Sequence, residues 1–223
     1  MKSNIVPNVS PEIKALLKKH SGGIKLDIGC GSTKMEGHVG MDMLPLPGVD
    51  IVWNVEQFPW PLPDESVSLA QSSHLVEHLM PTAPDPRLSN LCELLVKKKV
   101  FTQKESDLYL GEVRPGPIFL RFMDEVWRIL KPNGIFHFVA PYAGSPGYWW
   151  DPTHINPIHE ITFEYFDPLA KRSWNPALQA SFWHFYKPKP WKIEAGTPLY
   201  SPDANIEVVM HKRVYREDGK YVD

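Results

Sequence analysis

The chain has 223 residues, of which 43% are hydrophobic and 22% are charged, a composition typical of one globular domain. Its 24 basic and 26 acidic residues give a formal net charge of −2, so no overall positive field would draw the molecule onto a phosphate backbone. The two cysteines, Cys30 and Cys92, cannot form a disulfide framework and indicate a reducing compartment, for which we expect the cytoplasm.

No part of the sequence predicts a membrane segment. Residues 1–9 lack a basic stretch followed by an apolar run, and no stretch approaches the roughly 20 apolar residues that cross a bilayer. We therefore expect neither secretion nor membrane insertion. The 23 prolines predict long ordered loops, and loops held by a scaffold commonly carry function.

The first 80 residues are expected to alternate short strands with turns. Ser10 and Pro11 are typical of a helix start, and Gly22-Gly23 predicts its end. Runs of apolar residues predict four strands, at 24–28, 39–43, 49–55 and 67–72. The prolines of residues 58–63 predict an extended loop, whereas residues 75–79 are typical of the start of a helix.

The pattern changes after residue 80. Residues 81–117 have proline-rich ends around a lysine-containing helical segment, and we interpret them as an insertion that forms a lid. An amphipathic helix is predicted at 118–130 and a strand at 135–140. After a long aromatic loop, two strands are expected at 191–194 and 206–214, with no helix between them.

This order of elements predicts an α/β fold. Strands that alternate with helices or loops indicate an open, mainly parallel sheet, and two late strands without an intervening helix indicate a hairpin. We expect a Rossmann-like, mainly parallel sheet with helices on both faces and a C-terminal antiparallel hairpin. A single domain would cover residues 1–223, with the inserted helical or lid segment at about 81–117.

A glycine-rich turn follows the first predicted strand. Gly29 and Gly31 allow positive φ and a close approach of the backbone to a ligand, although a Gly-x-Gly tripeptide also fits a tight turn without one. Asp42 ends the second strand, where a carboxylate can accept both hydroxyls of a ribose, and Asp27 is placed to meet a cationic amine. Lys34 replaces the third glycine of a dinucleotide fingerprint, so the turn favours S-adenosylmethionine over NAD.

Four ordered segments resemble class I S-adenosylmethionine-dependent methyltransferases, in particular a compact branch related to methyltransferase type 11. These are LDIGCGSTK, GMDM, VEQFPWPLPDESVSLAQSSHLVEHL and FMDEVWRILKPNGIFHFVAPY, which together span about residues 24 to 142. The resemblance implies S-adenosyl-L-methionine as cofactor and S-adenosyl-L-homocysteine as product. It also implies cofactor contacts from the turns that follow the first four strands, at Asp27, Gly29, Cys30, Gly31, Asp42, Met43, Asn54, Val55, Ser73 and His74.

Two features depart from the family pattern. The family often has an acid that hydrogen-bonds the adenine amino group, and the matching position here is Asn54, whose side-chain oxygen can still accept. The interval from Gly31 to Asp42 is short and leaves little room for the usual first crossover helix. We therefore expect an unusual covering of the methionine end of the cofactor.

Methyl transfer requires an aligned nucleophile and the exclusion of water, but no obligatory catalytic side chain. A hydroxyl acceptor must also lose its proton, and the candidate catalytic residues are His154, His74 and Asp151, which follow predicted strands. Glu77 and His78 lie nearby and also fit a structural role. Large aromatic side chains and a neighbouring histidine predict an acceptor pocket, formed by Tyr148, Trp149, Trp150 and His159.

Asp151, His154 and His159 match no strong metal-ligand spacing, so we expect no metal site. The net charge and the aromatic loop favour a small molecule or sugar as acceptor, while lysines in the insertion leave nucleic acid open as a partner. No membrane partner is expected, and the oligomeric state is left open. The leading interpretation is an S-adenosylmethionine-dependent methyltransferase, with a non-catalytic S-adenosylmethionine-binding or regulatory protein on the same fold as the alternative. An NAD-dependent oxidoreductase is disfavoured by the incomplete phosphate-binding turn.

Overall fold

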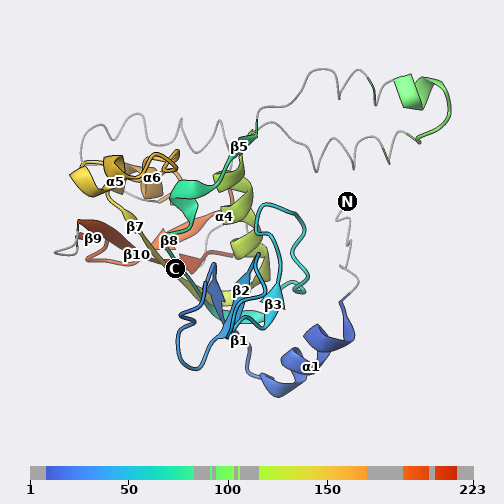
Figure 1. The fold of residues 1–223 in the computed structure, drawn as a ribbon, viewed down its shortest axis with the longest axis horizontal. Helices are drawn as coiled ribbons and strands as arrows, with labels where there is room; N and C mark the ends of the chain where they lie inside the picture. The colour runs from blue at the N-terminus through green and yellow to red at the C-terminus, as the bar shows by residue number, and fades with distance from the viewer. Residues whose placement is uncertain are drawn as a thin grey trace.

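A computed structural model describes residues 9–82, 91, 94–102, 105, 116–169, 188–200 and 204–214. Its main sheet contains strands β1 (Ile24–Ile28), β2 (Val39–Asp42), β3 (Ile51–Val52), β4 (Val67–Ser73), β7 (Leu130–Pro141), β8 (Trp191–Ile193), β9 (Leu199–Tyr200) and β10 (Asn205–Lys212). The spatial order is β3-β2-β1-β4-β7-β10-β8, with β9 paired to β10 (Figure 1). The sheet therefore joins segments from both halves of the sequence.

The strand directions confirm the expected fold class. Neighbouring strands from β3 through β2, β1 and β4 to β7 run parallel. β10 lies between β7 and β8 and is antiparallel to both. The fold is thus an α/β, Rossmann-like, mainly parallel sheet with helices around it and a C-terminal antiparallel hairpin.

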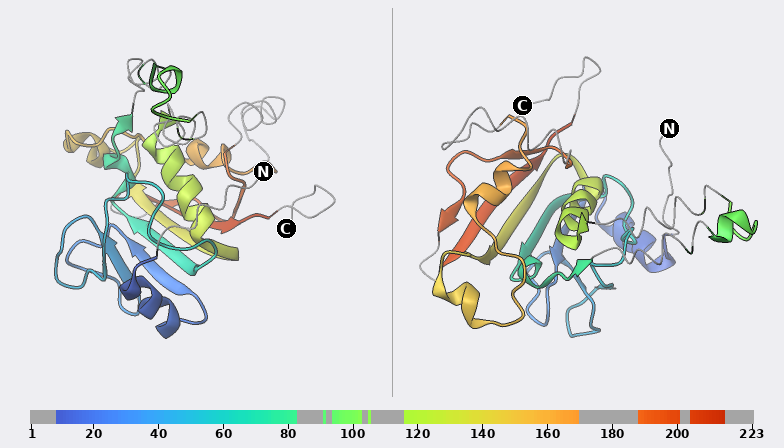
Figure 2. Two further views of the ribbon diagram at one scale, coloured as in Figure 1. Left: turned by 90° about the vertical axis from the view of Figure 1, so that its right-hand side faces the viewer. Right: turned by 90° about the horizontal axis from the view of Figure 1, so that it is seen from above.

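In the described part of the chain the labelled helices are α1 (Pro11–Lys19), α4 (Ile118–Ile129), α5 (Pro146–Trp150), α6 (Glu160–Glu164) and the 3-10 helix η1 (Val76–His78), and residues 94–97 are also helical. The side chain of Ser10 accepts a hydrogen bond from the Ile13 amide at 3.3 Å, so α1 begins as predicted. Figures 1 and 2 show α4 along one face of the sheet, with α5 and α6 near the carboxyl end of β7.

An aromatic layer attaches α4 to the sheet. Phe136 and Phe138 lie two residues apart on β7 and so face the same side. Phe136 lies 6.2 Å from Phe122 of α4, and Phe138 lies 6.4 Å from Phe119, measured between ring centroids. Phe138 also packs against Phe163 of α6, with 5.0 Å between the centroids. The layer holds the carboxyl end of β7, and the loop after it, against the helices.

The helix expected to start at residues 75–79 does not extend beyond η1. The Asn156 side chain donates hydrogen bonds to the carbonyls of Val76 and Leu79. The amides of Ile155 and Asn156 donate to the carbonyl of Glu77. The carbonyls that would continue an α-helix are therefore occupied by a segment far along the chain, and the prediction of a longer helix is wrong.

Two other predictions change in extent. The third strand, expected at residues 49–55, is reduced to Ile51–Val52, because the Asn54 side chain accepts from the Glu56 amide and forms a turn. The predicted insertion leaves and rejoins the domain through β5 (Pro81–Thr82) and β6 (Gly116–Pro117), which pair antiparallel. Most residues between them lie outside the described part of the chain, so the lid and the single-domain organisation stay predictions.

Glu125 of α4 anchors the proline-rich loop after β3. Its Oε1 accepts hydrogen bonds of 2.6 Å from the Trp60 amide and from Nη2 of Arg128, and its Oε2 accepts one of 3.0 Å from Nε of Arg128. Trp60 is fully buried, and its ring lies 5.5 Å from that of Phe122. This carboxylate therefore connects the loop to the core.

Replacing Glu125 should destabilise the fold. The Glu125→Ala change leaves the Trp60 amide without an acceptor and Arg128 without its less exposed partner, which should lower the free energy of unfolding by about 2–4 kcal/mol. Asp64→Ala removes only the exposed partner of Arg128, and should cost less than about 1 kcal/mol. Urea unfolding of both variants measures the difference, and equal losses would contradict the anchoring role.

Candidate functional site

The glycine-rich turn lies at the carboxyl end of β1, next to the carboxyl ends of β2 and β4. Gly29 and Gly31 have φ angles of 71° and 53°, a region that glycine adopts without strain. A Cβ atom on Gly29 would lie 2.9 Å from the side chain of Leu75, whereas one on Gly31 would have nothing within 4 Å. The close packing of the turn requires Gly29, and open space adjoins Gly31.

Asp27 lies in β1, two residues before Gly29, and is buried. Its Oδ2 accepts a hydrogen bond of 2.8 Å from the Met35 amide, and its Oδ1 accepts one of 2.9 Å from Nε2 of Gln71. The carboxylate thereby fixes the loop that occupies the place of a first crossover helix. Its predicted contact with a cationic amine stays a prediction.

Asp42 closes the turn from β2. Its Oδ2 accepts a hydrogen bond of 2.9 Å from the Gly31 amide, and its Oδ1 accepts one of 3.0 Å from the Leu44 amide. Each oxygen keeps a further lone pair, and the residue is only half-buried. Met43 and Leu44 follow it and are exposed, so a carboxylate and an apolar surface lie side by side.

Three further residues expected to contact the cofactor, Asn54, Val55 and Ser73, differ in their surroundings. Oδ1 of Asn54 accepts a hydrogen bond of 2.9 Å from the Glu56 amide. Val55 is buried, and its carbonyl accepts a hydrogen bond of 3.0 Å from Nε1 of Trp60. Ser73 ends β4 and is exposed. The cofactor contacts of these residues stay predictions.

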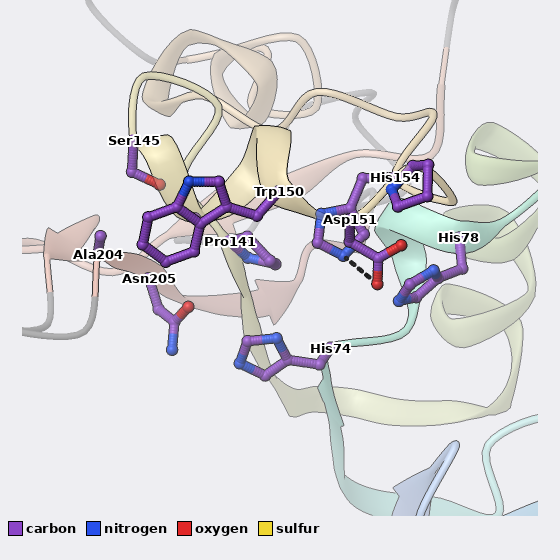
Figure 3. Close-up of a pocket in the computed structure, with 11 residues that line it drawn as sticks. His74, His78, Pro141, Ser145, Trp150, Asp151, His154, Ala204 and Asn205 are labelled. Atoms are coloured by element: carbon purple, nitrogen blue, oxygen red, sulfur yellow. Dashed lines mark ion pairs between the residues drawn. The ribbon is translucent and has the colours of Figure 1, made fainter.

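A cavity of about 640 Å³ lies beyond the carboxyl ends of β4 and β7 (Figure 3). Its lining comes from the turn after β4, the end of β7, α5 with its following loop, and the start of β10. These residues are His74, His78, Pro141, Ser145, Gly147, Trp150, Asp151, Pro152, His154, Ala204 and Asn205. This volume is in the range of small-molecule sites.

The two sides of the cavity differ in chemistry. Figure 3 shows Ser145, Trp150 and Asn205 on one side, and Asp151 with His154 and His78 on the other. Trp150 is 81% exposed and presents a flat aromatic face. One side can therefore pack against a planar or apolar group, while the other can handle charge or protons.

His74 and Glu77 meet at the edge of this cavity. Nδ1 of His74 lies 3.5 Å from Oε1 of Glu77, and the carboxylate raises the pKa of His74 above its ordinary value despite partial burial. His74 has a φ of 52°, an uncommon left-handed conformation for a residue other than glycine. The backbone therefore turns sharply here, between the glycine-rich turn and the cavity.

His154 is held in one tautomer by its surroundings. Its Nδ1 lies 2.8 Å from the carbonyl oxygen of Tyr148, which can only accept, so this nitrogen carries the proton. In the neutral ring Nε2 then carries the lone pair, and this nitrogen lies 3.7 Å from Oδ2 of Asp151. Hydrogen bonds from Thr153 to the other oxygen lower the pKa of Asp151.

The predicted acceptor residues separate in the structure. Trp150 lines the cavity, whereas Tyr148 is buried behind His154 and Trp149 is exposed with its Nε1 donating to the carbonyl of Ala143. His159 does not line the cavity. It is the N-cap of α6, and its ring contacts the Tyr142 hydroxyl and Glu160, each at 2.9 Å.

Sequence reasoning missed part of the cavity. Ser145 and Asn205 line it but were not predicted, because neither occurs in a motif and Asn205 precedes a predicted strand without any local sign of function. His78 was a candidate with a structural role as the alternative, and it lines the cavity. The pairing of β10 with β7, which brings Asn205 to the cavity, is a long-range contact.

Among the comparisons with known proteins, solved structures alone return matches. No family model matches the chain, and no curated protein matches it. Matching solved structures include an S-adenosylmethionine-dependent methyltransferase from Archaeoglobus fulgidus, at 18% identity over 90% of this chain and 93% of that one, with a TM-score of 0.45. One from Aquifex aeolicus matches at 13% identity over 92% and 90% of the chains, with a TM-score of 0.44.

A third match is phosphoethanolamine N-methyltransferase 1 from Haemonchus contortus, determined with phosphoethanolamine and S-adenosylhomocysteine. It is 11% identical over 90% of this chain and 41% of that one, with a TM-score of 0.48. Among the described residues, no helix combines the length and apolar character needed to cross a membrane.

The thiol of Cys30 should be unreactive in the folded protein. Burial, with the negative charges of Asp27 and Asp42, raises its pKa from 9.0 to about 11, which lowers the thiolate fraction about 100-fold at pH 8. Iodoacetamide should therefore modify Cys30 about 100-fold more slowly in folded than in guanidinium-unfolded protein. Mass spectrometry of the tryptic peptide 26–34 measures both rates, and similar rates would contradict this environment.

Proposed function

We propose that the protein transfers a methyl group from S-adenosyl-L-methionine to a small molecule bound in the cavity. The observation that carries this proposal is that the glycine-rich turn and the cavity share one segment. Leu75 packs against Gly29, and the preceding residue, His74, lines the cavity. A cofactor at the turn and an acceptor in the cavity would therefore be neighbours, as in-line transfer requires.

The residues around the turn fit the parts of this cofactor. The remaining lone pairs of Asp42 can accept the ribose hydroxyls, and the space beside Gly31 admits a group close to the backbone. Exposed Met43 offers an apolar surface for the adenine ring. The negative charges of Asp27 and Asp42 would attract a sulfonium and an ammonium group and repel a pyrophosphate.

The cofactor supplies an activated methyl group. When the acceptor attacks the methyl carbon, the carbon–sulfur bond breaks and its electron pair stays on sulfur. The protein must then orient the acceptor and take up a proton where the acceptor is a hydroxyl. Trp150 can stack against a ring, and Asn205 and Ser145 can hold polar groups. The side with His154 and Asp151 would take up the proton, with His74 at its edge.

The acceptor class follows from the shape and charge of the cavity. A volume of about 640 Å³ accommodates a ring or sugar with its substituents, and the lining combines one flat aromatic face with several polar groups. The net charge of −2 offers no general attraction to nucleic acid. A hydroxylated small molecule is therefore the proposed acceptor.

Cofactor binding can be tested without knowing the acceptor. At 100 times its dissociation constant, S-adenosylhomocysteine should stabilise the protein by about 2.7 kcal/mol, which raises the unfolding midpoint of a domain of this size by roughly 5–10 °C. NADH at the same concentration should leave the midpoint unchanged. Calorimetric scanning measures both, and no shift with saturating S-adenosylhomocysteine would refute the proposed cofactor.

The Asp42→Ala change should remove most of this shift, because the ribose loses its acceptor. Asp50→Ala is the matched control: Asp50 also accepts from a backbone amide, that of Gly40, but it precedes β3 instead of ending a strand, it pairs with Lys34, and no cofactor contact is expected from it. The control should lower the unliganded midpoint and keep the shift. A lost shift in both variants would mean that Asp42 acts only through the fold.

Methyl transfer itself should depend on His154. With any acceptor found by following S-adenosylhomocysteine production over a panel of hydroxylated small molecules, His154→Ala should lower kcat by about 100-fold or more. Its thermal shift with S-adenosylhomocysteine should persist. His211→Ala, which removes a surface histidine paired with Glu194, should keep full activity. Binding without turnover across the panel would instead favour the non-catalytic alternative.

A further inference from the structure

Three potential metal ligands converge beside the cavity. Glu77 and His78 of η1 and His154 of the loop after α5 each place one ligand atom so that all three atoms lie within 4.8 Å of one another. The amides of Ile155 and Asn156 donate to the Glu77 carbonyl at 2.8 and 3.1 Å. These backbone bonds fix the two segments together, so the cluster is built into the fold.

Hydrogen bonds place a proton on Nδ1 of both histidines, so each neutral ring carries its lone pair on Nε2. Nδ1 of His154 donates to the Tyr148 carbonyl, as described above. The Thr153 hydroxyl donates its only proton to Oδ1 of Asp151 at 2.6 Å, so at 2.9 Å its oxygen accepts from Nδ1 of His78. Partners of this kind on the far nitrogen are what orient histidines that bind metals.

Glu77 adds a carboxylate that the protein leaves without a hydrogen bond. Its side chain is 0% exposed, and neither Oε1 nor Oε2 accepts a hydrogen bond. The nearest nitrogens are Nδ1 of His74 at 3.5 Å and Nε2 of His78 at 3.9 Å. A buried carboxylate that accepts no hydrogen bond and has only two histidines near it is unfavourable, so this arrangement favours a bound cation.

We propose that Glu77, His78 and His154 bind a divalent transition metal of the Zn²⁺ type. Two imidazoles and one carboxylate form a ligand set that suits Zn²⁺ and leaves a coordination position open. His78 and His154 both line the cavity, so this open position would face the bound small molecule. The nearby carboxylate of Asp151 adds negative charge that favours a cation.

The dimensions are compatible with a metal after small side-chain movements. Two ligands at about 2.1 Å from a tetrahedral ion are about 3.4 Å apart. The present ligand atoms lie within 4.8 Å of one another, so the distances between them must shorten by at most about 1.4 Å. Rotation about side-chain bonds would have to supply this movement, because hydrogen bonds fix the backbone that joins η1 to the 155–156 segment.

The sequence prediction of no metal considered a different set of residues. Asp151, His154 and His159 have no suitable spacing, and His159 instead caps α6. The set found here combines adjacent residues, Glu77 and His78, with a histidine from beyond β7. Folding brings them together through the pairing of β4 with β7, which sequence spacing does not reveal.

The metal would act on the acceptor by binding its hydroxyl and lowering the pKa of that group. This step rests on the proposed methyl transfer, whereas metal binding does not. In this arrangement His154 holds the ion instead of taking up the proton, and the acceptor proton leaves to water. His154→Ala would lower turnover through loss of the ion.

Metal binding is tested on the full chain after chelator treatment, with Zn²⁺ and Co²⁺ as probes. Isothermal titration should give one tight Zn²⁺ site, and Co²⁺ should give the visible absorption of a four- or five-coordinate ion. The Glu77→Gln variant should bind at least about 100-fold more weakly. Its unfolding midpoint without metal should stay near that of the parent, because the amide keeps the shape and removes a buried charge that accepts no hydrogen bond.

The control is His137→Gln, which removes a histidine paired with Glu207 on the sheet and should bind Zn²⁺ like the parent. Unchanged Zn²⁺ affinity in Glu77→Gln would overturn the proposal. A large loss of stability of this variant without metal would also overturn it, because that result would indicate a purely structural carboxylate. S-adenosylhomocysteine binding is measured on the same samples. Zn²⁺ binding without S-adenosylhomocysteine binding would refute only the proposed cofactor. S-adenosylhomocysteine binding without Zn²⁺ binding would refute only the metal site.

Discussion

The site depends on the attachment of the 151–156 segment to the turn after β4. The Glu77 carbonyl accepts two amides from this segment, and the Asn156 side chain bridges the carbonyls of Val76 and Leu79. These bonds stop η1 after one turn and so keep Glu77, His78 and His154 on one side of the cavity. A continued α-helix would have used the same carbonyls internally and left the loop without an anchor.

Elsewhere, carboxylates hold short connections in place by accepting hydrogen bonds from backbone amides. Asp27 holds the Met35 amide, Asp42 the Gly31 amide, Asp50 the Gly40 amide and Glu125 the Trp60 amide. Each bond fixes a short loop at a sheet edge or helix face, where backbone donors would otherwise be unsatisfied. Glu77 differs from all of them, because its buried oxygens accept no hydrogen bond. This contrast separates the carboxylates that build the fold from the one that is available for a ligand.

Local patterns were sufficient for most of the fold. Ser10 with Pro11 located α1, the alternation of Ile24, Leu26 and Ile28 located β1, and the apolar face of residues 118–130 located α4. The glycine-rich turn was recognised because positive φ leaves a signature in residue type. Hydrogen bonds between distant segments leave no such signature in the sequence. Hence the length of η1, the entry of Asn205 into the cavity and the meeting of Glu77 with His154 could not be predicted.

The chemical difference between the two sides of the cavity has a consequence for orientation. A planar acceptor gains most by covering exposed Trp150, since this buries apolar surface on both partners. Its polar end then faces Asp151 and His154, where negative charge and a free imidazole lone pair favour a cation or an acidic proton. His74 lies between these groups and the segment that packs on Gly29. The reacting oxygen would thus lie nearest the glycine-rich turn, while the ring stays against Trp150 on the other side of the cavity.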